Sequence, residues 1–115
     1  MYFPSKLVLL SAFAALPAFA QGVTVKEDKP GLLKLAKISS EAATATALAK
    51  VPGGRVRSAE IERESGKLIY SFIIKVEGKT GVEEVNVDAV TGAIAAVEHE
   101  SDPLEAKAKA ATKKP

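Results

Sequence analysis

Three glutamates at alternating positions, Glu60, Glu62 and Glu64, are the first side chains in this sequence that could do chemistry. Side chains two residues apart in an extended strand project from the same face, so three carboxylates would stand in a row. Such a row could hold Ca²⁺ or another hard cation, which prefers oxygen ligands. The other interpretation is an exposed strand face neutralised by Lys67 or Lys75 through cross-strand pairs. Because a flat row does not wrap around an ion, we favour the second interpretation.

The run Glu98-His99-Glu100 is a second pattern that resembles a set of metal ligands. In a strand, however, His99 faces the side opposite to its two neighbours, so the three side chains cannot converge on one ion. We therefore expect a surface histidine at the end of a strand.

Asp88 and Thr91 carry side chains that serve as catalytic groups in other settings, but they stand in the run Asp88-Ala89-Val90-Thr91-Gly92. This run predicts a tight hairpin in which both side chains hold local backbone amides and Gly92 takes a positive φ. The sequence has no cysteine and a single histidine. It also shows no glycine-rich phosphate loop and no activated nucleophile. We expect no enzyme, no bound metal and no cofactor.

The charge of the chain is nearly balanced but unevenly distributed. Its 115 residues allow one domain, and 16 basic against 14 acidic residues give a net charge of +2. Residues 21–37 carry four cations against two carboxylates, residues 38–102 seven against eleven, and residues 103–115 four against one. An acidic body between basic ends gives no reason to expect nucleic acid as a partner. The Ala/Lys-rich residues 103–115 predict a flexible tail or a weak helix.

The first 20 residues have the order of a secretory signal peptide. Lys6 precedes an apolar run from Leu7 to Leu16, and Ala18-Phe19-Ala20 forms a small-x-small cleavage site. A run of that length is too short to cross a bilayer, which takes roughly 20 residues. No cysteine follows the site, so a lipoprotein anchor is not expected. The predicted mature chain begins at Gln21, lacks a membrane anchor, and resides in a bacterial periplasm or outside the cell.

The mature chain begins with an extension, residues 21–37, in which residues 28–31 predict a turn and residues 32–36 a short helix. Ser39 or Ser40 is a natural N-cap for a helix that continues to Lys50. Its apolar face is predicted to consist of small side chains, namely Ala42, Ala45, Leu48 and Ala49. The helix is expected to end at Pro52-Gly53-Gly54.

After this stop, the apolar residues follow a period of two, which is typical of strands. We predict strands at 56–64, 68–76, 85–89 and 94–98. The second is apolar on both faces, which predicts a central strand with the helix on its even-numbered face. Short turns between successive strands require antiparallel pairing. The expected fold is α+β, with one or two N-terminal helices packed on a three- to four-stranded antiparallel meander, and residues 38–102 form the domain.

In this order of elements the chain resembles the PepSY domain, a family named for peptidase propeptides and YpeB. The resemblance covers roughly residues 38–100. The residues that carry it are the helix with Ala45 and Leu48, the run 51–56 (VPGGRV), 59–62 (AEIE), Gly66-Lys67, Tyr70, 84–89 (EVNVDA) and Thr91-Gly92. The resemblance implies an exported α+β module that restrains or inhibits peptidases, and it implies no catalytic residues.

Two hypotheses for the function follow. In the first, the chain is a protein-binding module that docks a peptidase or an envelope protein by a sheet edge or by an acidic face, with Arg55, Arg57 and the three glutamates tuning the choice of partner. In the second, it binds a small ligand or a divalent cation with the acidic strand face. The first hypothesis predicts an uncovered edge strand beside an apolar strip. The second predicts carboxylates that converge on one point.

Overall fold

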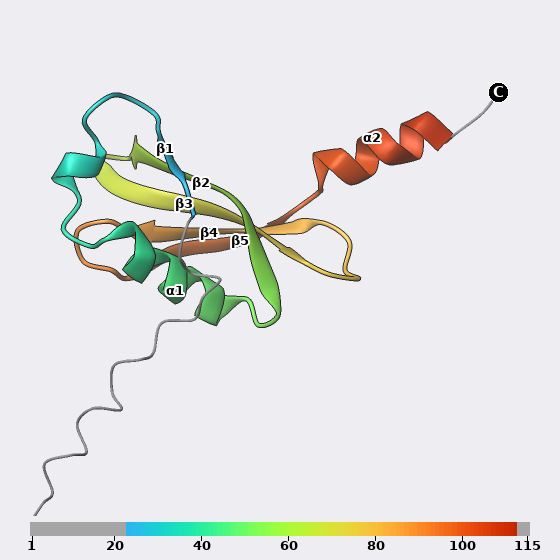
Figure 1. The fold of residues 1–115 in the computed structure, drawn as a ribbon, viewed down its shortest axis with the longest axis horizontal. Helices are drawn as coiled ribbons and strands as arrows, with labels where there is room; N and C mark the ends of the chain where they lie inside the picture. The colour runs from blue at the N-terminus through green and yellow to red at the C-terminus, as the bar shows by residue number, and fades with distance from the viewer. Residues whose placement is uncertain (1–22, 113–115) are drawn as a thin grey trace, which may run out of the picture.

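The computed structural model describes residues 23–112, and the predicted signal peptide and cleavage site lie outside this range. A single five-stranded sheet with the order β1-β2-β3-β4-β5 forms the body of the protein (Figure 1). The elements are β1 (Val25–Glu27), a 3-10 helix (Leu33–Leu35), α1 (Ser40–Lys50), β2 (Gly54–Glu64), β3 (Lys67–Val76), β4 (Val82–Asp88), β5 (Ile94–Glu100) and α2 (Pro103–Thr112). The α+β class and the antiparallel meander are confirmed, for β2 to β5.

The first strand, β1, was missed by the sequence analysis, which expected at most four strands. It pairs with β2 in parallel, and Val25 lies opposite Ala59. The chain between the two strands crosses over one face of the sheet through α1, as parallel neighbours require. Three residues are too few to show a clear alternation, and a parallel partner far along the sequence cannot be inferred from a local pattern.

The helix α1 begins where it was predicted to begin. The Ser39 side chain accepts a hydrogen bond from the Ala42 amide at 3.1 Å, which satisfies one of the unpaired donors of the first turn. The predicted buried face is wrong in part: Leu48 packs against the core, but the buried residues are Ala43, Thr44 and Ala47, whereas Ala42 and Ala49 are exposed. An alanine-rich helix has small side chains on all sides, so its apolar periodicity does not distinguish neighbouring faces.

The core lies between α1 and the face of the sheet that α1 covers, which we call the covered face (Figure 1). The even-numbered side chains of β3 point into it, as predicted, and Tyr70 and Phe72 stack there with ring centroids 6.2 Å apart. Ala43 and Ala47 are fully buried against this layer, and their small size lets the helix approach the sheet closely. The Tyr70 hydroxyl donates a hydrogen bond of 2.8 Å to the Ile38 carbonyl oxygen.

Both predicted turns have the expected chemistry. After α1, Gly53 takes a φ of +80°, and a side chain at Gly54 would collide with Ile74 and with the Val51 carbonyl. The segment Pro52-Gly53-Gly54 therefore lets β2 pass close to its neighbours.

In the hairpin between β4 and β5, the Asp88 carboxylate accepts from the amides of Val90 and Thr91, at 2.8 and 3.0 Å. The Thr91 hydroxyl oxygen accepts from the Ala93 amide, and Gly92 has a φ of +81°.

The C-terminal helix α2 extends away from the sheet (Figure 1). Its Leu104 side chain is exposed, and the contacts that join it to the sheet lie in its first turn. Among the described residues, no helix is long and apolar enough to cross a membrane.

Candidate functional site

The face of the sheet opposite α1, which we call the open face, holds most of the charged side chains that the sequence analysis singled out. Helix α1 packs on β2, β3 and β4 from the other side. Strand pairing places on the open face the residues Arg55, Glu60, Glu62, Glu64, Lys67, Ile69, Ser71, Ile73, Lys75, Glu84, Asn86, Asp88, Glu98 and Glu100. This face is therefore the candidate site.

Arg55 and Arg57, two of the three arginines of β2, fall on the open face because a β-bulge interrupts the pairing of β2 with β3. Val56 pairs with Ile74 and Ser58 with Ile73, so Arg57 is the extra residue. A bulge re-aims side chains. Arg57 reaches Asp102 with two hydrogen bonds, of 2.8 and 3.2 Å. Arg57 is thereby part of an internal ion pair rather than a free contact for a partner.

Asp102 lies between two basic side chains of the open face, Arg57 and Lys75, and pairs with both. Its side chain is only 2% exposed, and Lys75 Nζ lies 3.4 Å from Oδ2, the oxygen that also accepts one of the two hydrogen bonds from Arg57. Burial raises the pKa of the Asp102 carboxyl, but the Leu104 amide, Arg57 and Lys75 outweigh that effect and lower it below 3.8. Lys75 also pairs with Glu105, whose carboxylate accepts from the Gly81 amide. These groups hold the first turn of α2 to the sheet.

The row of Glu60, Glu62 and Glu64 exists as predicted, on one face of β2. Lys67 lies directly opposite Glu64 in the register, as the neutralised-face interpretation expects, whereas Lys75 is engaged with Asp102 and Glu105 instead. Burial and repulsion by Glu60 and Glu64 raise the pKa of Glu62 above 4.5. The three carboxylates of this row do not form a group that could share one ion.

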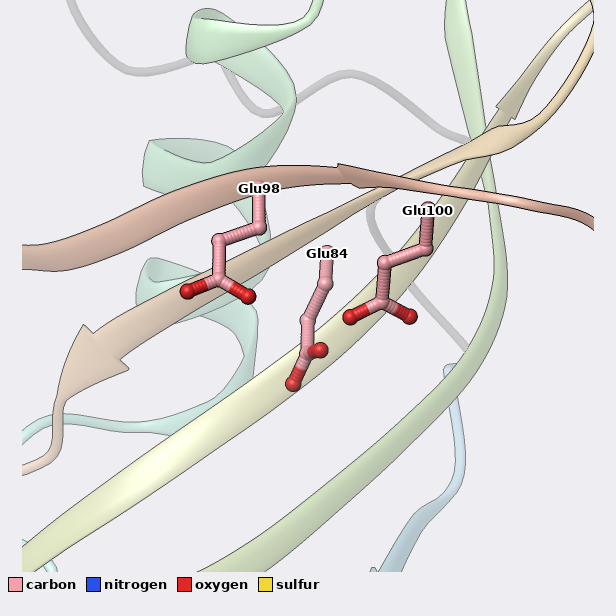
Figure 2. Close-up of side chains that lie close together, drawn as sticks. All are labelled: Glu84, Glu98 and Glu100. Carbon is pink, nitrogen blue, oxygen red and sulfur yellow. The ribbon is translucent and has the colours of Figure 1, made fainter.

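A different set of carboxylates does converge. Glu84 of β4 lies opposite Glu98 of β5, and Glu100 follows on the same side. Their nearest carboxylate oxygens lie within 4.8 Å of one another, and Figure 2 shows the three side chains pointing to the same side of the sheet. We call this set the acidic cluster. Its members were visible in the sequence as single residues, but only the β4–β5 register brings them together.

The acidic cluster is held partly by hydrogen bonds between its own members and their neighbours. The Ser71 hydroxyl donates to Glu84 at 2.9 Å. A hydrogen bond with Glu84, together with repulsion from it, raises the pKa of Glu100 above 4.5. Three carboxylates suit a hard cation chemically, but a flat sheet does not wrap around an ion and nothing else in the site points to one. The property that distinguishes the cluster is concentrated negative charge.

His99 points to the other side of β5, as predicted. Its Nδ1 lies 2.6 Å from a carboxylate oxygen of Glu83 on β4, and the imidazole is largely exposed. It takes no part in the acidic cluster.

The strand β5 is an edge of the sheet, because within residues 23–112 no strand pairs with its outer side. Helix α1 packs mainly on β2, β3 and β4. As a result Val97, which lies opposite the fully buried Val85 on the covered face, remains 45% exposed. The protein-binding hypothesis predicted an uncovered edge strand beside an apolar strip; β5 has the uncovered edge, but Val97 is the one large apolar side chain exposed on that strand.

Comparison with known proteins identifies one family. The family model described as "Peptidase propeptide and YPEB domain" (PepSY) matches residues 37–98, which is more than half of the chain. Neither the curated proteins nor the solved structures include a match. The matched range contains α1, β2, β3, β4 and most of β5, so it covers the helix-on-sheet core and the acidic face described above. The chain belongs to the PepSY family.

Proposed function

We propose that this protein is an exported, non-enzymatic binding module that docks another exported protein through the outer edge of β5. A peptidase is the partner that the family suggests, since the family description refers to peptidase propeptides. The predicted signal peptide supports export, to the periplasm or to the outside of the cell. The observation that carries the proposal is the open edge of β5 beside the exposed Val97.

An unpaired edge strand presents a row of backbone amides and carbonyls that another strand can bind. Proteins protect such edges with charged side chains, above all lysine, with proline, with bulges or with a covering segment. The strand β5, with the sequence IAAVEHE, contains neither lysine nor proline, and its charged side chains are the two glutamates at its C-terminal end. A partner that adds a strand there would gain main-chain hydrogen bonds and would bury Val97.

The test is affinity capture with the protein expressed from its full sequence and carrying a C-terminal tag. Wild type, Val97→Lys and Val90→Lys are used as baits on an envelope extract, with and without EDTA. Val90 is the matched control because it is an equally exposed valine, at 48%, in the β4–β5 hairpin. We expect wild type and Val90→Lys to retain the same protein, identified by mass spectrometry, and Val97→Lys to lose it.

A retained peptidase would then be assayed for inhibition by the same three proteins. Equal retention by all three baits would overturn docking at β5. Retention that disappears with EDTA would favour the cation-binding alternative over direct docking.

A further inference from the structure

The two sides of β5 differ in chemistry, and the difference specifies what kind of strand fits its edge. On the open face, Glu98 and Glu100 stand at the edge with Glu84 directly behind Glu98. On the covered face, the exposed Val97 lies just before Glu98, and the largely exposed His99, paired with Glu83, lies between the two glutamates. An added strand would also alternate its side chains between these two faces.

Resting on the docking proposal above, we infer that the partner contributes an extended segment in which lysine or arginine alternates with apolar residues. Its cationic side chains would lie on the open face against the acidic cluster, and its apolar side chains would pack on Val97. Cross-strand pairs of opposite charge and of apolar residues both stabilise a sheet.

The charge of the acidic cluster is not already neutralised within the protein. Among the described residues, no cation forms an ion pair with Glu84, Glu98 or Glu100. Two basic groups of the open face, Arg57 and Lys75, are engaged by Asp102. A hydrogen bond with Glu84 and repulsion from the other carboxylates of the cluster raise the pKa of Glu100, and a cation placed beside it would relieve that repulsion.

The same charges argue against a second copy of this chain as the occupant. Pairing β5 with β5 of another copy would bring Glu98 and Glu100 of both chains onto the same face. Like charges on facing strands destabilise a sheet. The edge of β5 is thus expected to repel β5 of a second copy and other acidic segments, and to attract a basic segment.

Binding of short synthetic peptides to the full protein, measured by fluorescence anisotropy, tests this inference. The probe is a peptide in which lysine and valine alternate. One control peptide has the same residues arranged in two blocks, and another has glutamine in place of lysine. We expect binding of the alternating lysine peptide only, and weaker binding at 1 M salt, where the Debye length shrinks to about 3 Å.

Two matched double variants test which carboxylates of the open face attract the lysine peptide. Glu98→Gln/Glu100→Gln should weaken binding of the alternating lysine peptide about fivefold or more, the effect of two lost ion pairs. Glu60→Gln/Glu62→Gln removes the same charge from the same face but from β2. Three strand spacings separate β2 from β5, or about 14 Å, so screening should leave binding within about twofold of wild type.

The outcomes separate this inference from the docking proposal. If the glutamine peptide binds as well as the lysine peptide and Val97→Lys abolishes both, the edge docks strands but the preference for basic segments is wrong. If no peptide binds while Val97→Lys still loses its captured partner, the inferred segment is again wrong and docking at β5 stands. Equal effects of the two double variants would also overturn the inference, because they would indicate a diffuse attraction.

Discussion

The covered and open faces of the sheet are formed by the same strands, but the covered face consists of buried apolar side chains and the open face of mixed apolar and charged ones. On the covered face, β3 contributes Leu68, Tyr70, Phe72 and Ile74, and all four are buried under α1 or its flanks. On the open face, the same strand contributes Ile69, Ser71, Ile73 and Lys75, with carboxylates from β2 and β4 on either side. Within the described residues no helix packs across this second set as α1 does on the covered face, and the first turn of α2 reaches it at Lys75 through Glu105.

The comparison shows that an uncovered face need not leave its centre exposed. Ile69 is only 3% exposed although no element lies over it. Its register partners are Glu62 and Asp88, and the stems of long charged side chains can cover apolar surface while their charged ends stay in water. Farther along β3, Ser71 and Ile73 line a hollow of about 330 Å³ together with Glu60, Glu62 and Glu84. We infer that the packing on the covered face contributes most of the stability, whereas the open face presents charged side chains to solvent.

The largest change in the free energy of unfolding is expected when a packed side chain of the covered face is truncated. Phe72→Ala removes a fully buried ring from the covered face and should lower the free energy of unfolding by about 3–5 kcal/mol. Ile73→Ala, at the next position but on the open face, removes a half-buried side chain and should cost about 1 kcal/mol. Urea denaturation followed by circular dichroism measures both. Equal losses would contradict the assignment of stability to the covered face.

A smaller effect is expected for the hydroxyl groups of two consecutive residues. Tyr70→Phe removes the hydrogen bond to the Ile38 carbonyl and should cost about 1 kcal/mol, because that carbonyl loses its partner beneath α1. Ser71→Ala removes a hydrogen bond to Glu84, which water can replace on the open face, and should cost about 0.5 kcal/mol or less. The same denaturation experiment compares them, and a larger loss at Ser71 would reverse the contrast.

The open face should also show stabilisation when charge is removed. Burial and like charges raise the pKa of Glu62, so the folded protein binds more protons than the unfolded chain above pH 4.5. Stability from this group therefore falls as the pH rises from 4.5 through the raised pKa. Glu62→Gln should raise the free energy of unfolding at pH 7 by roughly 0.5 kcal/mol and leave it nearly unchanged at pH 4. Glu77→Gln, in the exposed β3–β4 turn, is the matched control for the loss of one carboxylate.

The smallest effect on global stability is expected at Asp102, where the change should stay local. Asp102→Asn weakens the pairing with Arg57 and Lys75 that holds α2. Hydrogen exchange of α2 should therefore accelerate while exchange of β3 is unchanged.

In wild type, the lowered pKa of Asp102 means that protection of α2 persists above pH 3.8 and is lost as the pH falls through the lowered pKa. Asp28→Asn, an exposed aspartate near β1, is the control. Faster exchange in β3 as well would show that α2 is part of the core.

Local patterns were sufficient to predict much of this fold. The cap at Ser39, the turn at Gly53 and the hairpin at Asp88 were predicted because each depends on residues within a few positions of one another. The apolar alternation of β3 was enough to make it the central strand and to orient it toward α1.

Features that depend on distant pairing could not be predicted in the same way. The acidic cluster needs the register between Glu84 and Glu98, and the fixation of α2 needs Arg57 to meet Asp102 across 45 positions. Residues 103–115 were expected to form a flexible tail or a weak helix, and their composition gave no sign of the contact that Glu105 makes with Lys75. The alternation of side chains along a strand was enough to place Glu98 and Glu100 on the same face. It could not show that Glu84, on the neighbouring strand, lies beside them.

The parallel pairing of β1 has a consequence for the order of folding. Val25 lies opposite Ala59, which follows it by 34 positions in the sequence. In a chain that emerges N-terminus first, from a ribosome or through a membrane channel, β1 therefore appears well before the strand that it must join. Closing so long a loop is costly until other contacts compensate. Although β1 is the first strand to be released, it should thus be among the last to pair with its neighbour in the sheet.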